Sequence, residues 1–415
     1  MEEAPKQPLV IEDDPRFVLP RLVDDQLAAE LVLRGMRERK ALTIRVGIYT
    51  FIGAVVGAIS VLVHVDILPL LFLSMFLSAL VGRLLANQVE RAMRRRQHDR
   101  AARLLPNATY WTCMLSPFAY FSQLRCLQMQ VNLILLEGRY TELEIVSLYA
   151  KGYNERVADP QGVPKNWAIA NNLAIAHMQQ GRYKEGAEMF QAALANAKEK
   201  RQLTFLHSNL SFCQMRLGQI SEAVENNKIA LALTGREAKT QLGCLVLAIE
   251  ALLKSKCEQF DEAEKLVEEL RSKLSAKQTT PDVVITRECT MAEIRWRQKR
   301  YDEAKLYFHN GLDLLKSADN PNYYVIVQLE REYAQCLEES GDLKGAEKAL
   351  LRAEEYFNFY LKRELDAIDL VRSRLANGKS INYAAQLLDL SHRSHYIPSI
   401  EFQRDFDLID DHSVN

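Results

Sequence analysis

The sequence lacks the short motifs by which common catalytic and cofactor sites are recognised. Its 415 residues contain no G-x-x-x-x-G-K-[ST] phosphate loop, no G-x-G-x-x-G loop, no G-x-S-x-G nucleophile motif and no H-E-x-x-H zinc motif. His392 and His395 lie three residues apart, but no cysteine or third ligand lies close to them in the sequence. These absences predict a protein that is not an enzyme and that binds no cofactor or metal.

The sequence also has no excess of charge of either sign and no cysteine pairs. Its 53 Lys and Arg residues balance 54 Asp and Glu residues, so no overall field favours nucleic acid as a partner. Its seven cysteines are scattered without a C-x-x-C pair, which is typical of reduced thiols that pack in an interior. The first 20 residues are acidic, contain four prolines and lack the basic start of a signal peptide.

Two long apolar runs are the strongest local signal. Residues 46–65 and 67–86 are each about 20 residues long, the length that a helix needs to cross a bilayer. They predict a two-helix transmembrane hairpin over residues 43–86, with its turn at Asp66. The alternatives are a hairpin buried in protein, which needs a large partner to cover it, and a re-entrant hairpin. Asp66 argues against the re-entrant form, because a charge near the bilayer centre costs at least ~2.5 kcal/mol.

Basic residues flank both ends of the predicted hairpin and are missing from its turn. Five lie in residues 34–45 and seven in residues 83–103, so the positive-inside rule places both termini on the cytoplasmic side. We therefore predict a multi-pass protein of a bacterial inner membrane or an organelle membrane, with residues 1–42 as a cytoplasmic arm that contains a short amphipathic helix. Gly53 and Gly57 provide a small-residue face that packs the hairpin on itself or pairs two copies in a homo-oligomer.

A basic segment and an aromatic cluster follow the hairpin. Residues 87–120 are predicted to form a juxtamembrane helix and a cap for the helices that follow. Near an anionic leaflet each basic residue contributes about 1 kcal/mol of attraction, so we expect contacts with lipid headgroups; alternatively, the charges only fix the orientation. An arginine cluster without an aromatic stacking platform gives little support for RNA binding. The residues predicted to contact lipid headgroups are Arg91, Arg94, Arg95 and Arg96.

One short phrase recurs six times within residues 121–375. It consists of a turn residue, an aromatic or aliphatic residue two positions later, and, in five of the six copies, a small residue three positions after that. A second column of small residues lies seven positions before the turns. Two antiparallel helices approach closely only where side chains are small, so the phrase predicts about six stacked helix pairs in an all-α solenoid. The turn residues, 37 to 43 positions apart, are Gly138, Gly181, Gly218, Glu258, Lys299 and Gly341.

This pattern resembles the tetratricopeptide-repeat (TPR) family, whose unit is a helix–turn–helix. The stretch from Asn171 through Gly181 and Tyr183 to Leu194 is most similar to the repeats of kinesin light chains. The repeats are longer than the usual 34 residues, and the small residue of the first helix is never Gly. The resemblance implies that the first helix of each pair lines a concave groove that binds proteins or peptides. The residues it places in that groove are Asn132, Asn171, Asn172, Gln179, Asn209, Arg216 and Arg297.

Two asparagines occupy the same repeat position in this predicted groove. Asn172 and Asn209 are 37 residues apart, and an exposed amide both donates and accepts hydrogen bonds, so the pair could hold an extended peptide backbone. The alternative is a solvated polar helix face. The Lys and Asn arrangement by which TPR co-chaperones clamp a C-terminal carboxylate is not reproduced, so we do not expect a chaperone tail as the ligand.

These features together predict a membrane-anchored scaffold or adaptor for protein–protein interaction. Its groove is expected to bind partner proteins or peptides, and its residues 376–415 are expected to form an acidic tail. The alternative is a structural or membrane-shaping protein, or an accessory subunit of a membrane complex, in which the hairpin is the active part.

Overall fold

The structure is a computed structural model, and its described residues are almost all helical. It describes residues 15–17, 19–63, 68–94, 138–155, 162–234, 240–273, 281–317 and 321–377, with residue 159 and isolated positions between 100 and 135. These residues form α-helices and one short 3-10 helix, Pro15–Phe17, and contain no strand. The all-α prediction is confirmed over this part of the chain. The chain divides into two compact units, residues 1–32 with 137–364, and residues 33–136 with 365–415.

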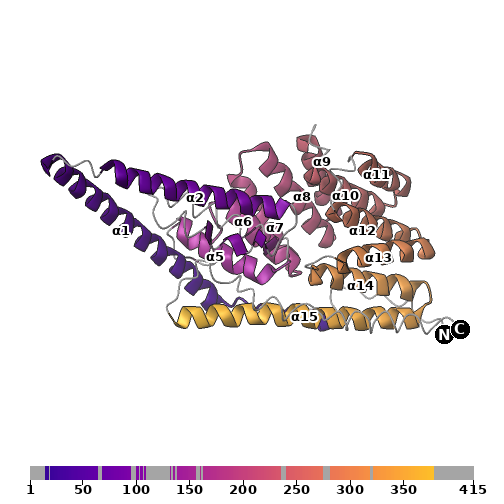
Figure 1. Ribbon diagram of the computed structural model, residues 1–415. Helices are drawn as coiled ribbons and strands as arrows, with labels where there is room; N and C mark the ends of the chain where they lie inside the picture. The colour runs from indigo at the N-terminus through magenta and orange to yellow at the C-terminus, as the bar shows by residue number, and fades with distance from the viewer. Residues whose placement is uncertain are drawn as a thin grey trace. The chain divides into compact units, whose positions relative to one another are not determined.

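The first unit is a stack of antiparallel helix pairs (Figure 1). Consecutive helices contact one another in order from α5 to α14, and α8 also contacts α6 and α10. This is the predicted solenoid, with five complete pairs and the second helix of one more pair among the described residues. The helices are α5 (Tyr140–Glu155), α6 (Trp167–Gln179), α7 (Tyr183–Asn196), α8 (Lys200–Arg216), α9 (Ile220–Thr234), α10 (Gln241–Lys256), α11 (Phe260–Lys273), α12 (Pro281–Arg297), α13 (Tyr301–Lys316), α14 (Tyr323–Glu339) and α15 (Leu343–Ala376), of which residues 343–364 belong to this unit.

The six predicted turn residues share a left-handed backbone conformation. Gly138, Gly181, Gly218 and Gly341 have φ between 63° and 87°, and Glu258 and Lys299 have φ of 59° and 58°. These are the positive-φ residues of the described chain. At the five turns after Gly138, the residue that follows the turn residue donates its N–H to a carbonyl five positions back, as Arg182 does to His177 at 2.9 Å. This closes α6, α8, α10, α12 and α14 with a Schellman motif, which glycine favours because it has no Cβ.

We expect glycine to stabilise the two turns that lack it. Glu258→Gly and Lys299→Gly should each raise the free energy of unfolding by about 0.5–1 kcal/mol, because an L side chain in the left-handed region costs roughly 1–2 kcal/mol and glycine's extra entropy in the unfolded chain offsets part of this gain. Urea unfolding measures the change. The control is Lys265→Gly at an exposed position in the middle of α11, which should lower stability by roughly 0.5–1 kcal/mol. A loss of stability in both turn variants would contradict the prediction.

The small residues of the repeated phrase lie where the two helices of a pair touch. Ser211 is fully buried and its Oγ donates a hydrogen bond to the carbonyl of Ala223 at 2.7 Å. A Cβ added to Gly186 would lie 3.2 Å from the carbonyl oxygen of Ala174, so a larger residue would push α6 and α7 apart. The packing reason for the two columns is therefore confirmed. Their buried members are Leu143, Gly186, Ala223, Ala263, Ala304 and Ala346, and Val131, Ala174, Ser211, Ala251, Ala292 and Ala334.

The helix stack contacts itself across a large sequence separation. Asn322, just before α14, donates a hydrogen bond to the hydroxyl of Tyr140 in α5 at 2.9 Å. The backbone N–H of Thr141 donates to Glu364 at 2.7 Å, and Arg363 donates to the carbonyl of Gly138 at 2.8 Å. Burial raises the pKa of Tyr140 to about 12. Contacts between α5 and the last helix pair, α14 and α15, therefore close the superhelix on itself.

The start of the chain packs into this same unit. The Phe17 ring is 5% exposed and lies 5.9 Å from the Phe357 ring in an edge-on arrangement. Asp24 caps α1 (Asp25–Val63) by accepting the N–H of Leu27 at 2.7 Å. A Cβ added to Gly152 would lie only 2.0 Å from the carbonyl oxygen of Val32. The backbones of α1 and α5 are therefore in direct contact at this point.

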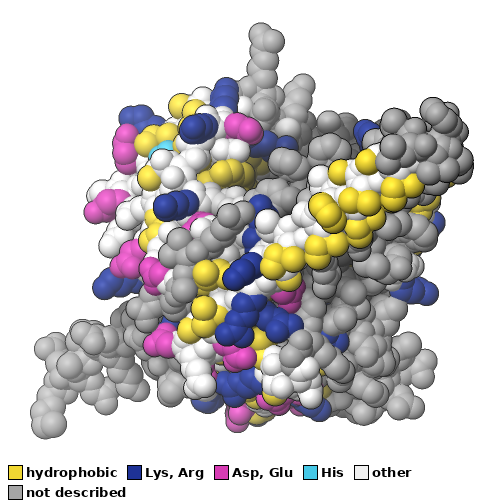
Figure 2. Space-filling model, turned by 90° about the vertical axis from the view of Figure 1, so that its left-hand side faces the viewer, with side chains coloured by type: hydrophobic (Ala, Val, Ile, Leu, Met, Phe, Trp, Pro, Cys, Tyr) yellow, Lys and Arg dark blue, Asp and Glu magenta, His cyan; other side chains and the backbone are white. Residues whose placement is uncertain are grey.

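The second unit contains most of α1 and α2 (Leu68–Arg94). Its described core consists of small and aliphatic side chains, among them Ala86, Val89 and Leu105. Figure 2 shows a band of hydrophobic side chains on one face of the molecule. Large exposed apolar residues along the two helices include Ile48, Phe51, Ile52, Ile59, Leu77 and Leu84.

The predicted transmembrane hairpin is not supported by these helices. A crossing helix needs about 20 predominantly apolar residues. Over the residues that the structure describes, no helix has an apolar stretch long enough to cross a membrane. α1 carries Arg34 to Lys40 before its apolar part, α2 contains Arg83 and Glu90, and the predicted turn at residues 64–67 lies outside the described residues. The predicted localisation, a two-helix membrane protein with cytoplasmic termini, is therefore wrong.

Candidate functional site

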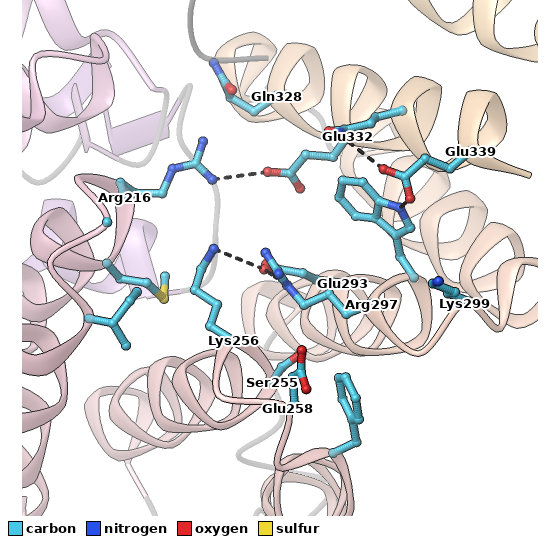
Figure 3. Close-up of a pocket in the computed structure, with 16 residues that line it drawn as sticks. Arg216, Ser255, Lys256, Glu258, Glu293, Arg297, Lys299, Gln328, Glu332 and Glu339 are labelled. Carbon is cyan, nitrogen blue, oxygen red and sulfur yellow. Dashed lines mark hydrogen bonds and ion pairs between the residues drawn. The ribbon is translucent and has the colours of Figure 1, made fainter. Parts of the chain in front are cut away.

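A cavity of about 560 Å³ lies among the first helices of four consecutive pairs. Its described lining comes from the C-terminal ends of α8, α10 and α12, from the turns that follow them, from the first residues of α9 and α11, and from α14 (Figure 3). α8, α10, α12 and α14 are the helices that the TPR resemblance places on the concave face. The polar lining includes Arg216, Lys256, Glu293, Arg297, Glu332 and Glu339, and the apolar lining includes Met215, Ile220, Phe260 and Trp296.

Repeat geometry explains why several of these charges meet. Arg216, Lys256 and Arg297 each lie two residues before a turn residue and are the last residues of α8, α10 and α12. Glu339 holds the same position in α14. A cation at a helix C-terminus is favoured by the helix dipole, which accounts for three of these side chains but not for the carboxylates opposite them. The repeat therefore places one column of charges along a single cavity.

Two ion pairs cross the cavity. Arg216 and Lys256 extend from α8 and α10, and Glu293 and Glu332 face them from α12 and α14 (Figure 3). Arg216 Nη1 lies 3.4 Å from Glu332 Oε1, and Lys256 Nζ lies 3.8 Å from Glu293 Oε1. We call Arg216 and Lys256 the cationic side, and Glu293, Glu332 and Glu339 the acidic side. Both signs occur throughout the lining, because Glu258, Arg297 and Lys299 also belong to it and Arg297 Nε pairs with Glu293 at 2.9 Å within α12.

Burial shifts the pKa values of two of these groups against their charged forms. Burial raises the pKa of Glu332, and the nearby Arg216 guanidinium opposes the shift. Burial lowers the pKa of Lys256, and Glu293 opposes that shift. In both groups desolvation outweighs the attraction of the partner across the cavity. The charged forms of Glu332 and Lys256 are therefore disfavoured in this cavity.

An aromatic side chain completes the acidic side. The indole Nε1 of Trp296 donates a hydrogen bond to Glu339 Oε2 at 2.8 Å, and the ring lies 6.4 Å from the ring of Phe308. The indole and the neighbouring carboxylates together suit a cationic group, because a cation is attracted both to a carboxylate and to an aromatic face.

The structure brings two of the predicted groove residues into the cavity and places the others elsewhere. Arg216 and Arg297 line it. Asn171, Asn172 and Asn209 are buried, at 6%, 8% and 6% exposure, and are not part of the cavity's described lining. Gln179 is half-buried and also outside that lining, and Asn132 lies outside the described residues.

The buried asparagines are nevertheless unusual. Asn171 Oδ1 and Asn209 Nδ2 have no hydrogen-bond partner among the described residues. Asn171 lies ten residues before its turn, and Arg331 in α14 holds the same repeat position. Arg331 Cζ lies 4.8 Å from the centre of the Phe17 ring, so part of the predicted groove is covered by the start of the chain itself.

Two further predictions made from the sequence are not tested by these residues. Of the predicted lipid-contact residues, Arg91 is exposed on α2, and the side chains of Arg94, Arg95 and Arg96 lie outside the description. A Cβ added at Gly53 would meet nothing within 4 Å, which leaves that helix face open. His392, His395 and the rest of residues 378–415 lie outside the described residues.

The lining residues outside the predicted groove set include Glu293, Glu332, Glu339 and Trp296. Glu339 can be predicted as a lining residue, because it lies two positions before a turn residue, as Arg216 and Arg297 do. Glu293 and Glu332 occupy different repeat positions and meet the cationic side only through folding, so no repeated spacing indicates them. Trp296 directly precedes Arg297 on α12, and no repeated spacing in the sequence indicates that it lines a site.

Comparison with known proteins supports the repeat fold. The chain is similar to a crystal structure of a Rap protein complexed with competence and sporulation factor, with a TM-score of 0.50 and 13% sequence identity over 77% of this chain and 88% of that chain. No protein-family model matches the sequence, and no curated protein matches it. The structural likeness and the six left-handed turns together show a TPR-like helical-repeat fold.

Proposed function

We propose that this protein is a protein–protein interaction scaffold that binds an extended peptide segment of a partner. The observation that carries the proposal is the cavity itself, which is formed by four consecutive first helices and lined by charges and by Trp296. A concave site with a few convergent polar groups is the usual form of a binding site. Arg216 and Arg297, which the sequence placed in the groove, are both in it.

The comparison supports a peptide as the ligand class. The Rap protein of similar fold is complexed with competence and sporulation factor. We propose that the present superhelix binds its ligand on its concave side, and that its repeats are of the kinesin-light-chain type. We propose no catalytic role. The membrane-shaping alternative depends on the transmembrane hairpin, which is not supported, and we do not propose it.

Proximity labelling in the protein's own cell tests this proposal. The comparison is between the full-length wild type and the double variant Arg216→Ala/Lys256→Ala, and we expect at least one labelled partner to fall by about tenfold in the variant, which corresponds to 1.4 kcal/mol of lost binding. The control is Lys254→Ala, which removes a cation on the same helix that pairs with Glu262 outside the cavity lining. Identical partner sets in wild type and double variant would refute the proposed site.

A further inference from the structure

The segment that precedes α1 packs against the last helix pair. The Phe17 ring is 5% exposed, with Arg331 Cζ 4.8 Å from its centre and the Phe357 ring 5.9 Å away in an edge-on arrangement. Arg16 Cζ also lies 5.4 Å from the centre of the same ring. Arg331 belongs to α14 and Phe357 to α15, so the ring contacts both helices of the last pair. We call residues 15–23 the leading segment; residue 18 is not among those described.

This contact lies on the face of α14 that also lines the cavity. Gln328 and Gln335 of α14 are lining residues. Arg331 comes three residues after Gln328 and four before Gln335, and residues at these spacings share one side of a helix. Arg331 also holds the repeat position of Asn171 in α6, which the sequence placed in the groove. The Phe17 ring therefore occupies a part of the concave surface next to the cavity.

The leading segment is held in the way that an extended peptide is held in a groove. Residues 19–23 form neither helix nor strand. Phe17 and Val23 are buried, whereas Pro20 and Arg21 between them are exposed. A few buried anchors separated by solvated residues are typical of a peptide bound to a groove. The repeats therefore already hold one short segment, and an aromatic side chain is its anchor.

The helix that follows the leading segment has contacts of its own with the superhelix. Leu27 and Leu31 of α1 are buried, and the backbone of Val32 lies directly against Gly152 of α5. These contacts hold the start of α1 in place without residues 15–23. The leading segment can therefore leave its site while α1 stays attached.

We propose that the leading segment is a built-in occupant of the peptide-binding surface, and that the partner segment which replaces it brings an aromatic side chain to Arg331 and Phe357. A guanidinium near the centre of a ring and a second ring edge-on to it both favour an aromatic side chain over an aliphatic one. While the leading segment is in place, the apparent affinity for a partner falls with the fraction of molecules whose site is open. The inference rests on the proposed function and names the ligand class of the same concave surface.

Binding of a synthetic peptide tests the proposal. The probe is a fluorescent peptide of residues 13–24 with blocked ends, titrated against the full-length wild type and full-length Phe17→Ala by fluorescence anisotropy. The variant should bind the peptide at least about tenfold more tightly, because its own segment has lost its anchor. The same peptide with Phe17→Leu should bind the variant about tenfold more weakly than the unchanged peptide does.

Three further full-length variants locate the site at which the peptide binds. Gln26→Ala changes an exposed residue in the first turn of α1 and should bind the peptide as weakly as the wild type. Phe17→Ala/Arg331→Met replaces the guanidinium by an apolar side chain and should lose most of the gain. Phe17→Ala/Phe357→Leu keeps the site apolar and should also lose it, which preserves the test if the Arg331 variant does not fold.

Each contrary result of these titrations overturns a stated part of the inference. Equal affinity of the wild type and Phe17→Ala, or no binding to either, would overturn the built-in occupancy. Equal binding of the two peptides would overturn the aromatic requirement. Double variants that bind as tightly as Phe17→Ala would show that the peptide binds elsewhere.

Proximity labelling with the full-length protein distinguishes this inference from the function on which it rests. Partners that depend on Arg216 and Lys256 should be labelled more strongly in Phe17→Ala than in the wild type. If these partners are lost in Arg216→Ala/Lys256→Ala but labelled equally in Phe17→Ala and the wild type, the inference fails and the proposed function stands. Partner sets that are unchanged in both variants would overturn both.

Discussion

Replacing Glu330 by glutamine should lower the free energy of unfolding by about 3–5 kcal/mol. Glu330 is fully buried on α14, where it accepts hydrogen bonds from Lys316 of α13 at 3.0 Å and from Arg352 of α15 through two contacts of 3.0 Å. The substitution removes the buried negative charge with which both half-buried cations pair, and breaking a buried pair in this way is strongly destabilising. Urea unfolding followed by circular dichroism measures the loss.

The matched control for this prediction is a half-exposed glutamate on the neighbouring helix. Glu303 pairs with Arg300 at 2.5 Å and with Arg295 at 3.2 Å, but its side chain is nearly half exposed and Arg295 also pairs with Glu264. Glu303→Gln should change stability by less than about 1 kcal/mol, because pairs with an exposed member contribute little. A Glu330→Gln variant no less stable than Glu303→Gln would show that the three helices are not held together by this carboxylate.

Gly152→Ala should detach the start of α1 from the superhelix and cost about 3 kcal/mol. The added Cβ would lie 2.0 Å from the carbonyl oxygen of Val32, and a backbone atom cannot give way as a flexible side chain can. The segment that must move carries Phe17, Val23 and Leu27, which are buried in the closed structure. Limited proteolysis should therefore cut residues 15–32 faster in the variant than in the wild type.

Gly53→Ala is the control for this second prediction. It makes the same chemical change in α1 at a position where the new Cβ meets nothing within 4 Å. Alanine there should be neutral or stabilising, since it is the better helix former by about 1 kcal/mol. If both glycine variants behaved alike, the close contact between Gly152 and Val32 would not be a determinant of the fold.

The repeats could be predicted because each residue in the phrase acts locally. Glu258 and Lys299 stand where other copies have glycine, and still adopt the left-handed conformation, because the register of the small residues on either side fixes the turn. The spacing of Ala174 and Gly186, or of Ser211 and Ala223, follows from the contact within one helix pair. Such contacts span only 12 residues, so a repeating sequence displays them directly.

The candidate site could be predicted only in part. Arg216 and Arg297 were found because they occupy a groove position of the repeat, whereas Glu332 belongs to α14 and meets Arg216 across 116 residues of sequence. The asparagines at 171, 172 and 209 were expected to face solvent and are buried. The rotation between successive helix pairs decides which side chains face the interior of the superhelix. No single repeat position in the sequence predicts the size of that rotation.

The membrane prediction went wrong for a different reason. Hydropathy alone scores the runs at 46–65 and 67–86 as two independent crossing segments. The described helices are α1, which runs without a break from Asp25 through a charged stretch, and α2, which continues past Arg83 to Arg94. Among the residues described, neither helix provides a crossing segment.

The contacts that close the superhelix also determine how it can come apart. In an open repeat array each unit touches only its neighbours, so the array can fray or be shortened from one end. Here the bonds of Tyr140 with Asn322 and of Thr141 with Glu364 join residues 182 and 223 positions apart. Loss of the last helix pair thus removes partners of the first, which gives the array the long-range contact order and all-or-none melting of a globular domain.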